Sequence, residues 1–246
     1  MGDKSVVILL VEDEEAHAKL IKRAIVESMP EWELHHVSNL EDAFRWINEN
    51  DPPSVIVADH RLPDGDGLEL IEGAKRVNGT KIPVIVLTAY GTEEIAVHSL
   101  KSGAMDYVVK SAERFKELPW IVERTLREWG YILERKEANE YISAIFVATP
   151  DPLCVLDLNG IRIDCNPAME EITGLSREEL IGKPAYITFT EGKEECERAL
   201  EEVIRTGHAD HLERTILTKD GKKILYMPTS TREEMQMVIR SEQSLL

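Results

Sequence analysis

The chain has 246 residues, of which 43% are hydrophobic, and a formal net charge of −17 from 46 acidic and 29 basic residues. This length and composition allow two domains with packed cores and argue against wholesale disorder. An acidic surface repels phosphate backbones, so we expect no nucleic-acid binding. No apolar run approaches bilayer length and the N-terminus has no basic signal region, so we expect a cytoplasmic protein without membrane attachment.

The first half alternates between strand-like and helix-like segments. Ser5–Val11 is continuously apolar and β-branched, as a strand buried on both faces should be. Further strands are expected at Glu33–Val37, Val55–Ala58, Pro83–Leu87 and Asp106–Val109, and helices at Glu14–Met29, Leu40–Ile47, Leu68–Ala74, Thr92–Leu100 and from Glu113. Five successive strand–helix units predict an α/β doubly wound, five-stranded parallel sheet.

Reactive side chains follow four of these strands. Strand one ends in Glu12-Asp13, strand three in Asp59, strand four in Thr88 and strand five in Lys110. Ligands of such sheets bind beyond the carboxyl ends of the strands, so these side chains should converge. Carboxylates placed together repel one another unless a hard cation joins them, and Mg²⁺ prefers such oxygen ligands. Alone, an aspartate at a strand end is typical of a cap or a turn, Thr88 of a helix cap and Lys110 of an exposed lysine. The combination in order is what favours a functional site.

The segments VILLVEDE, VIVADHRLPDGDG, VIVLTAYG and GAMDYVVK resemble the receiver domains of two-component response regulators. This resemblance implies that Asp59 is the phosphoacceptor and that Asp13 is a metal ligand. It places Glu12 at the other position of the acidic pair and assigns the backbone carbonyl of Arg61 to the same Mg²⁺. The pair is Glu-Asp rather than Asp-Asp, a change that should preserve Mg²⁺ binding.

The resemblance also gives roles to the remaining strand-end residues. Thr88 would sense the phosphoryl group through its hydroxyl, Lys110 would bind it as a cation, and Tyr107 would be the aromatic switch residue. Ser111 follows Lys110 where the family usually has proline, so the resemblance does not determine the geometry of that loop. The implied reaction is phosphoryl transfer from a phosphohistidine of a separate sensor kinase or phosphotransfer protein, in a chain that is not itself an enzyme.

We expect the other conspicuous polar residues of this half to have structural roles or to be exposed. Asp64 and Asp66, in the sequence PDGDG, are expected to build a turn rather than to bind metal. Spacing suggests no partners for His35, His36 and His60, and we expect them to be structural or exposed.

A long helical segment follows the predicted receiver. Its apolar stripe runs from Leu118 to Leu133, is interrupted by the charged ERKEANE, and resumes from Tyr141 to Phe146. One continuous helix, able to pair with its copy in a homodimer, and two helices joined by a solvated linker both fit this pattern.

The second half is typical of an α+β domain with an antiparallel sheet. Strands are expected at Leu153–Leu158, Ile161–Cys165, Leu212–Thr218 and Lys223–Met227, with helices at Ala168–Ile172, Arg177–Leu180 and Lys193–Arg205. The phrases DPLCVLDLNGIRIDCNPAMEEITGLSREELIGK and LTKDGKKILYMPTS resemble a PAS sensory domain, a match carried by Asn166, Ala168, Gly174, Glu179, Leu180 and Gly182. The only candidate for the final strand of such a domain is MQMVIR, so the sheet could be incomplete.

PAS domains hold haem, flavin, a metabolite or nothing, and we expect no cofactor here. The three cysteines, Cys154, Cys165 and Cys196, do not stand in a flavin-adduct motif, and the helix Lys193–Arg205 carries no histidine. His208 and His211 come just after that helix and are expected to be exposed. The cysteines are odd in number and without CxxC spacing, so they predict neither a disulfide framework nor a zinc site.

These observations predict a receiver domain over residues 1–130, a helical linker over 131–150, a PAS-like sensory or dimerisation domain over 151–230 and a tail over 231–246. The expected function is that of a response regulator phosphorylated on Asp59 in a Mg²⁺-dependent reaction, with output by protein contacts. A phosphorylation-independent PAS ligand-binding adaptor is the first alternative. A Mg²⁺-dependent phosphohydrolase is the second, although Arg61 stands where such an enzyme usually has its acid/base carboxylate.

Overall fold

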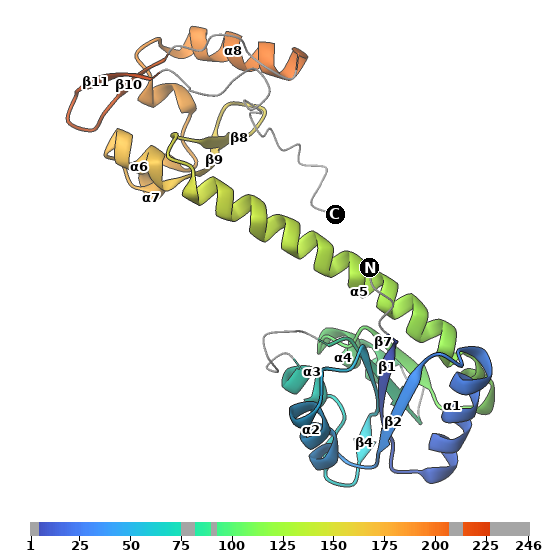
Figure 1. The fold of residues 1–246 in the computed structure, drawn as a ribbon. Coiled ribbons are helices and arrows are strands. Elements are labelled where there is room, and N and C mark those ends of the chain that lie inside the picture. Colours follow the sequence, from blue (N-terminus) through green and yellow to red (C-terminus); the bar gives the residue numbers. More distant parts are fainter. Residues whose placement is uncertain (1–4, 75–81, 90–92, 207–213, 227–246) are drawn as a thin grey trace. The chain divides into compact units, whose positions relative to one another are not determined.

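The computed structural model describes residues 5–74, 82–89, 93–206 and 214–226. The chain divides into two compact units, Met1–Lys136 and Glu137–Leu246 (Figure 1). Within the described residues no helix is both long enough and apolar enough to cross a bilayer.

The first unit is built on a five-stranded parallel sheet with the strand order β2-β1-β3-β6-β7. Its strands are β1 (Val7–Val11), β2 (Glu33–Val37), β3 (Val55–Asp59), β6 (Val84–Thr88) and β7 (Asp106–Val109). The helices are α1 (Glu15–Ser28), α2 (Leu40–Glu49), α3 (Glu69–Ala74), α4 (Glu93–Lys101) and the start of α5, and they flank the sheet (Figure 1). The predicted doubly wound α/β fold is confirmed.

The three central strands, β1, β3 and β6, contribute to two cores, one on either face of the sheet. Leu9 and Ile56 belong to the core that includes α2 and α3 residues, whereas Ile8 and Val57 belong to the core that includes α1 and α5 residues. Successive side chains of a strand point to opposite faces, so a strand covered by helices on both sides is apolar throughout. This is why the uninterrupted apolar runs of the sequence become the central strands.

The start of α2 is held by two side chains. The Asn39 side chain accepts a hydrogen bond from the Asp42 N–H at 2.8 Å. The Asp64 carboxylate accepts the N–H groups of Leu40 and Glu41, each at 2.9 Å. The Leu40 bond lowers the pKa of Asp64, because it stabilises the charged carboxylate. Asp64 therefore caps α2 from a loop that is distant in the sequence. The expectation that it builds a turn did not include this role.

Helix α5 (Ala112–Ala148) is one helix of 37 residues, about 55 Å long at 1.5 Å per residue. Of the two arrangements that the sequence left open, the continuous helix is the one observed. Its first turns pack Phe115, Leu118 and Val122 into the core on the α1 face. Pro119 lies within the helix and is buried.

The second unit contains two antiparallel two-stranded sheets and several short helices. Its elements are β8 (Cys154–Leu156), β9 (Arg162–Cys165), α6 (Pro167–Thr173), α7 (Arg177–Leu180), the 3₁₀ helix η1 (Ala185–Thr188), α8 (Lys193–Thr206), β10 (Arg214–Leu217) and β11 (Lys223–Tyr226). This agrees with the α+β architecture expected for the second half. The MQMVIR segment that could supply a last strand lies outside the described residues.

Asn166 organises the beginning of this unit. Its side chain is fully buried and caps α6 by accepting the Met169 N–H at 3.1 Å. The same oxygen accepts the Leu153 N–H at 2.9 Å, and the amide nitrogen donates to the carbonyls of Asp151 and Thr149 at 2.8 and 3.2 Å. One side chain thus fixes the helix start and the chain that leads into β8, because buried polar groups must find partners.

Candidate functional site

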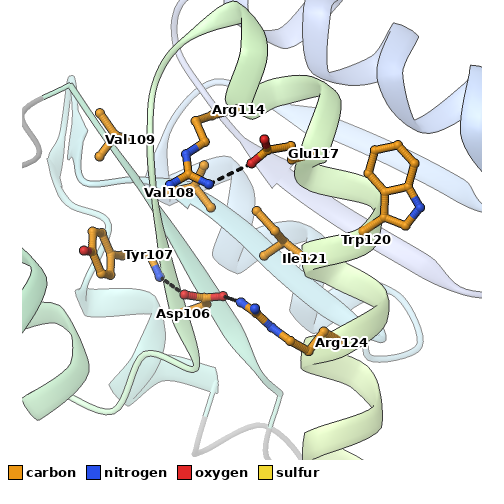
Figure 2. Close-up of a pocket in the computed structure, with 9 residues that line it drawn as sticks. All are labelled: Asp106, Tyr107, Val108, Val109, Arg114, Glu117, Trp120, Ile121 and Arg124. Atoms are coloured by element: carbon orange, nitrogen blue, oxygen red, sulfur yellow. Dashed lines mark hydrogen bonds and ion pairs between the residues drawn. The ribbon is translucent and has the colours of Figure 1, made fainter.

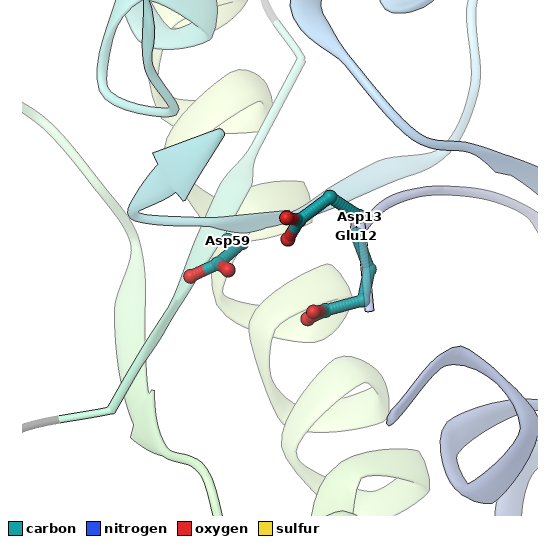
Figure 3. Close-up of side chains that lie close together, drawn as sticks. All are labelled: Glu12, Asp13 and Asp59. Carbon is teal, nitrogen blue, oxygen red and sulfur yellow. The ribbon is translucent and has the colours of Figure 1, made fainter. Parts of the chain in front are cut away.

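Three carboxylates meet at the carboxyl edge of the first unit's sheet. Glu12 and Asp13 follow β1, and Asp59 is the last residue of β3, the strand beside it. One oxygen from each lies within 4.8 Å of the others, and Figure 3 shows the three side chains gathered at this edge. Parallel strands end at the same edge, so the register of β1 and β3 brings these residues together.

Lys110 joins two of these carboxylates from the far side of the sheet. Its Nζ donates to Glu12 Oε1 at 2.8 Å and to Asp59 Oδ2 at 2.5 Å. The lysine follows β7, which is separated from β3 by β6, so its side chain reaches past the end of β6. The backbone N–H of Lys110 donates to the carbonyl of Thr88 at 2.8 Å, which extends the β6–β7 pairing and holds the lysine in place.

All members of the cluster except Asp13 are buried, and burial sets their electrostatics. The side chains of Glu12, Lys110 and Asp59 are 0%, 7% and 10% exposed. Burial raises the pKa of Glu12, and its hydrogen bond from Lys110 opposes that effect without cancelling it. For Lys110, burial by itself lowers the pKa, but the hydrogen bonds to Asp59 and Glu12 outweigh it and raise the pKa. The lysine is therefore held as a cation between two acidic groups.

The donor set fits a hard divalent cation such as Mg²⁺. Glu12 Oε2 is buried, and no donor among the described residues reaches it. Asp13, in contrast, is exposed at the rim, where a cation that keeps several waters would sit. Three carboxylates with a single neighbouring lysine leave an excess of negative charge that such a cation would neutralise.

The loop after Asp59 passes very close to that residue. The Arg61 N–H donates to Asp59 Oδ1 at 3.3 Å, and the side chain of Arg61 is exposed. Gly67 lies against the backbone, where an added Cβ would fall 1.9 Å from the Asp59 carbonyl oxygen. Only glycine fits there, which explains the second glycine of PDGDG. The assignment of the Arg61 carbonyl to a metal remains a prediction.

Thr88 ends β6 beside Asp59, with the register pairing Asp59 with Leu87 and Thr88 with Val109. It is 3% exposed. The structure therefore brings Thr88 to the same sheet edge as the carboxylates and Lys110, as the sequence order predicted. Its function as a phosphate-sensing hydroxyl stays a prediction.

Tyr107, on β7, is half-buried and lines a groove of about 590 Å³ between β7 and α5. Figure 2 shows its ring and the Trp120 indole on opposite sides of this groove. Asp106 pairs with Arg124 across the groove, and the Arg114 guanidinium lies 2.7 Å from Glu117. The role of Tyr107 as a switch remains a prediction.

Two histidines near the site were not assigned to it from the sequence. His36 donates through Nε2 to the carbonyl oxygen of Glu12 at 2.8 Å, so it supports the acidic residue from β2. His17 Nδ1 lies 3.5 Å from Glu12 Oε1 and 3.2 Å from Glu14 Oε2, and its ring stands edge-on to Phe115. Neither histidine's contact with Glu12 could be predicted from the sequence, because each depends on how α1 and β2 pack beside β1.

The histidines of the second unit that were considered as cofactor ligands cannot be placed in a site. His208 and His211 lie outside the described residues, and the expectation that this domain binds no cofactor remains a prediction.

Family models match both halves of the chain. Residues 8–123 match the response regulator receiver domain, and residues 140–232 match the PAS fold. The chain therefore carries a response regulator receiver domain followed by a PAS domain, which confirms the resemblance noted in the sequence.

Curated relatives resemble the receiver half. The chain is 46% identical over 134 residues to the methanogenesis regulatory protein FilR1 of Methanothrix harundinacea, a match that covers 54% of this chain and 30% of that protein. It is 31% identical over 150 residues to the regulatory protein AtoC of Escherichia coli, which covers 53% and 32% respectively. Among solved structures, the receiver domain of Francisella response regulator 1452 is 28% identical, with a TM-score of 0.44 over 50% of this chain and 98% of that chain. The matched part of this chain is thus about a third of either curated relative.

Proposed function

We propose that this protein is a two-component response regulator that accepts a phosphoryl group on Asp59 from a separate histidine kinase or phosphotransfer protein. The observation that carries the proposal is the convergence of Glu12, Asp13 and Asp59 around one buried lysine at the carboxyl edge of the sheet. The relatives named as regulatory proteins support the same assignment.

In the proposed reaction a carboxylate oxygen of Asp59 attacks the phosphorus of a phosphohistidine. The new P–O bond forms as the P–N bond breaks, and the imidazole leaves with the electron pair of that bond. Lys110 stands beside the nucleophile as a fixed cation and can pair with the incoming phosphoryl oxygens. Mg²⁺, held by Asp13, Glu12 and Asp59 with the Arg61 carbonyl, would supply neutralisation of charge on the phosphoryl group.

The neighbouring residues define how phosphorylation would be read. Thr88 lies at the end of the strand next to Asp59, where its hydroxyl can meet a phosphoryl oxygen. Tyr107, on the following strand, would move inward as Thr88 is drawn towards the phosphoryl group. The new charge then biases two arrangements of the face formed by α4, β7 and α5. The PAS domain would contribute sensing or dimerisation, and the output would pass through protein contacts.

The proposal is tested by the intact mass of the protein after incubation with phosphoramidate and Mg²⁺. Wild type should gain one phosphoryl group only when Mg²⁺ is present, and the adduct should survive acid and be lost in base, as an acyl phosphate is. Asp59→Asn should gain none. Asp66→Asn, which changes a half-buried carboxylate of the adjacent loop, should behave like wild type.

Two other outcomes have a clear meaning. If Mg²⁺ binds but no adduct forms, the adaptor driven by the PAS domain becomes the better explanation. If phosphate is released steadily without an adduct, the phosphohydrolase does.

A further inference from the structure

Two cysteines of the PAS domain face each other across a pair of strands. In the β8–β9 ladder Cys154 is the direct partner of Cys165. The Asn166 N–H donates to the Leu153 carbonyl at 3.1 Å, so the hydrogen bond lies one residue outside the cysteine pair. The Cys165 N–H donates instead to its neighbour's carboxylate, Asp164 Oδ1, at 2.8 Å. The cysteines therefore occupy a non-hydrogen-bonded position of the antiparallel pair.

Such a position brings two side chains closest together. Directly opposed residues there have Cα atoms about 4.5 Å apart. Disulfides join Cα atoms that are about 4.4–6.8 Å apart, so the strand pairing itself provides a separation at which a bond can form. In addition, both residues contribute to the same small core with Met169 and Leu180, which places their side chains on one face of the β8–β9 pair.

The two thiols differ in their surroundings. Cys165 is 4% exposed, and burial followed by the nearby Cys154 raises its pKa to about 11. Cys154 is only partly buried. Burial raises the pKa of Cys154 as well, but the Arg162 guanidinium beside it acts in the opposite direction. Cys154 is thus the more exposed residue of the pair, and the cation beside its thiol is the buried Arg162.

Arg162 is held firmly in that position. Its side chain is 1% exposed and donates to the carbonyls of Pro184 and Ala185 at 3.1 and 2.8 Å. These partners are neutral, so the guanidinium keeps its full charge close to Cys154.

We propose that Cys154 and Cys165 form a reversible dithiol–disulfide site within the PAS domain. With a low-molecular-weight disulfide as oxidant, the Cys154 thiolate attacks one sulfur and displaces a thiolate, which leaves Cys154 in a mixed disulfide. The Cys165 thiolate then attacks the Cys154 sulfur and displaces the second small thiolate. The protons of the two cysteines end on the two released thiols, so two protein thiols are oxidised and one small disulfide is reduced.

The disulfide would form next to the residue that holds the start of the PAS domain together. Cys165 immediately precedes Asn166, the residue whose side chain binds Thr149, Asp151 and Leu153. A covalent link between β8 and β9 would therefore fix the segment through which the chain enters the PAS domain. The redox state of this pair and the freedom of that segment would change together.

The test uses the full chain equilibrated in glutathione buffers from fully reduced to fully oxidised. Thiols are trapped with acid and N-ethylmaleimide, and peptides are mapped by mass spectrometry. Wild type and Cys196→Ser should both acquire a Cys154–Cys165 bond, lose the mass of two hydrogen atoms, and regain it on reduction. Cys165→Ser should stop at a mixed disulfide on Cys154, and Cys154→Ser should react with the oxidant at least tenfold more slowly.

Circular dichroism of each variant establishes that it is folded, and the wild-type mapping does not depend on any variant. The proposal is overturned if Cys154 and Cys165 both remain alkylated in every buffer in which the protein is folded. It is overturned equally if the bond that forms contains Cys196.

Discussion

Replacing Lys110 by methionine removes the cation that touches Glu12 and Asp59 while keeping a side chain of similar length. We expect the receiver domain to become less stable when no divalent cation is present. Both carboxylates are almost fully buried, and without the ammonium they would face each other and Asp13 without the cation that now bonds to both.

The structure sets the size of this effect. Removing one member of a buried ion pair costs about 3–5 kcal/mol, because the remaining charge is buried without compensation. Glu12 already has a raised pKa, so it can take up a proton and relieve part of that cost. The lower end, about 3 kcal/mol, is therefore expected, which is a shift of about 1.5 M in the midpoint of a urea transition.

The measurement is urea unfolding of the full chain in EDTA, followed by the far-ultraviolet signal and by intrinsic tryptophan fluorescence. Lys19→Met is the matched control. It removes a lysine that is 74% exposed and lies 3.3 Å from Glu15, so it should change the stability by less than about 0.5 kcal/mol. Adding Glu12→Gln to Lys110→Met should return about half of the lost stability, because it removes the unpaired buried charge.

The reasoning fails if Lys110→Met unfolds at the same urea concentration as Lys19→Met. It also fails if Glu12→Gln makes the double variant less stable than Lys110→Met alone. Either result would mean that the ammonium does not compensate the buried carboxylates.

Three further predictions address the metal, the PAS core and pH. Asp13→Asn should weaken Mg²⁺ binding at least tenfold in isothermal titration calorimetry, whereas Asp51→Asn, an exposed residue before β3, should leave it unchanged; equal affinities would exclude Asp13 as a ligand. Asn166→Ala should cost the PAS domain about 3 kcal/mol in thermal or urea unfolding, because several buried backbone groups lose their partner; a cost below that of Asn159→Ala, in the exposed turn, would contradict this. Cys165 has a pKa of about 11 in the fold against an ordinary value of 9.0, so the folded state holds that proton more tightly. The stability it contributes is complete below pH 9 and is lost as the pH rises towards 11; Cys165→Val should show a flatter decline in thermal unfolding over that range, and an equal decline would refute the assignment.

The sequence predicted the receiver fold and the strand ends at which the candidate site lies for one physical reason. Each buried parallel strand is apolar on both faces, so the first polar residue after it marks the strand's carboxyl end. Glu12, Asp59, Thr88 and Lys110 all stand at such ends, and the parallel topology then brings the ends together. Side chains far apart in the chain could therefore be assigned to one site without any contact being known.

Contacts that depend on tertiary packing could not be predicted in this way. The Asp64 cap joins a loop to a helix that begins 24 residues earlier, and no local pattern encodes that distance. The support of Glu12 by His36 requires the register of β1 and β2. Gly67 could be recognised as a turn glycine, but its approach to the Asp59 carbonyl depends on where the loop returns.

In the PAS half, too, some features could be predicted from the sequence and others depend on tertiary packing. Asn166 was identified from the resemblance, and its bonds explain why that position requires an amide: it must accept from two N–H groups and donate to two carbonyls at once. The pairing of Cys154 with Cys165 escaped the sequence because cysteine spacing alone does not give strand register.

The ammonium group of Lys110 can donate one more hydrogen bond than the two that it makes to the carboxylates. An ammonium group carries three protons, and in the described part of the chain two of them are directed to Glu12 and Asp59. The third leaves room for one more acceptor without the loss of either existing bond. In the proposed phosphoryl transfer, a phosphoryl oxygen could therefore join the lysine as an added partner while the lysine still ties together the strand ends of β1, β3 and β7.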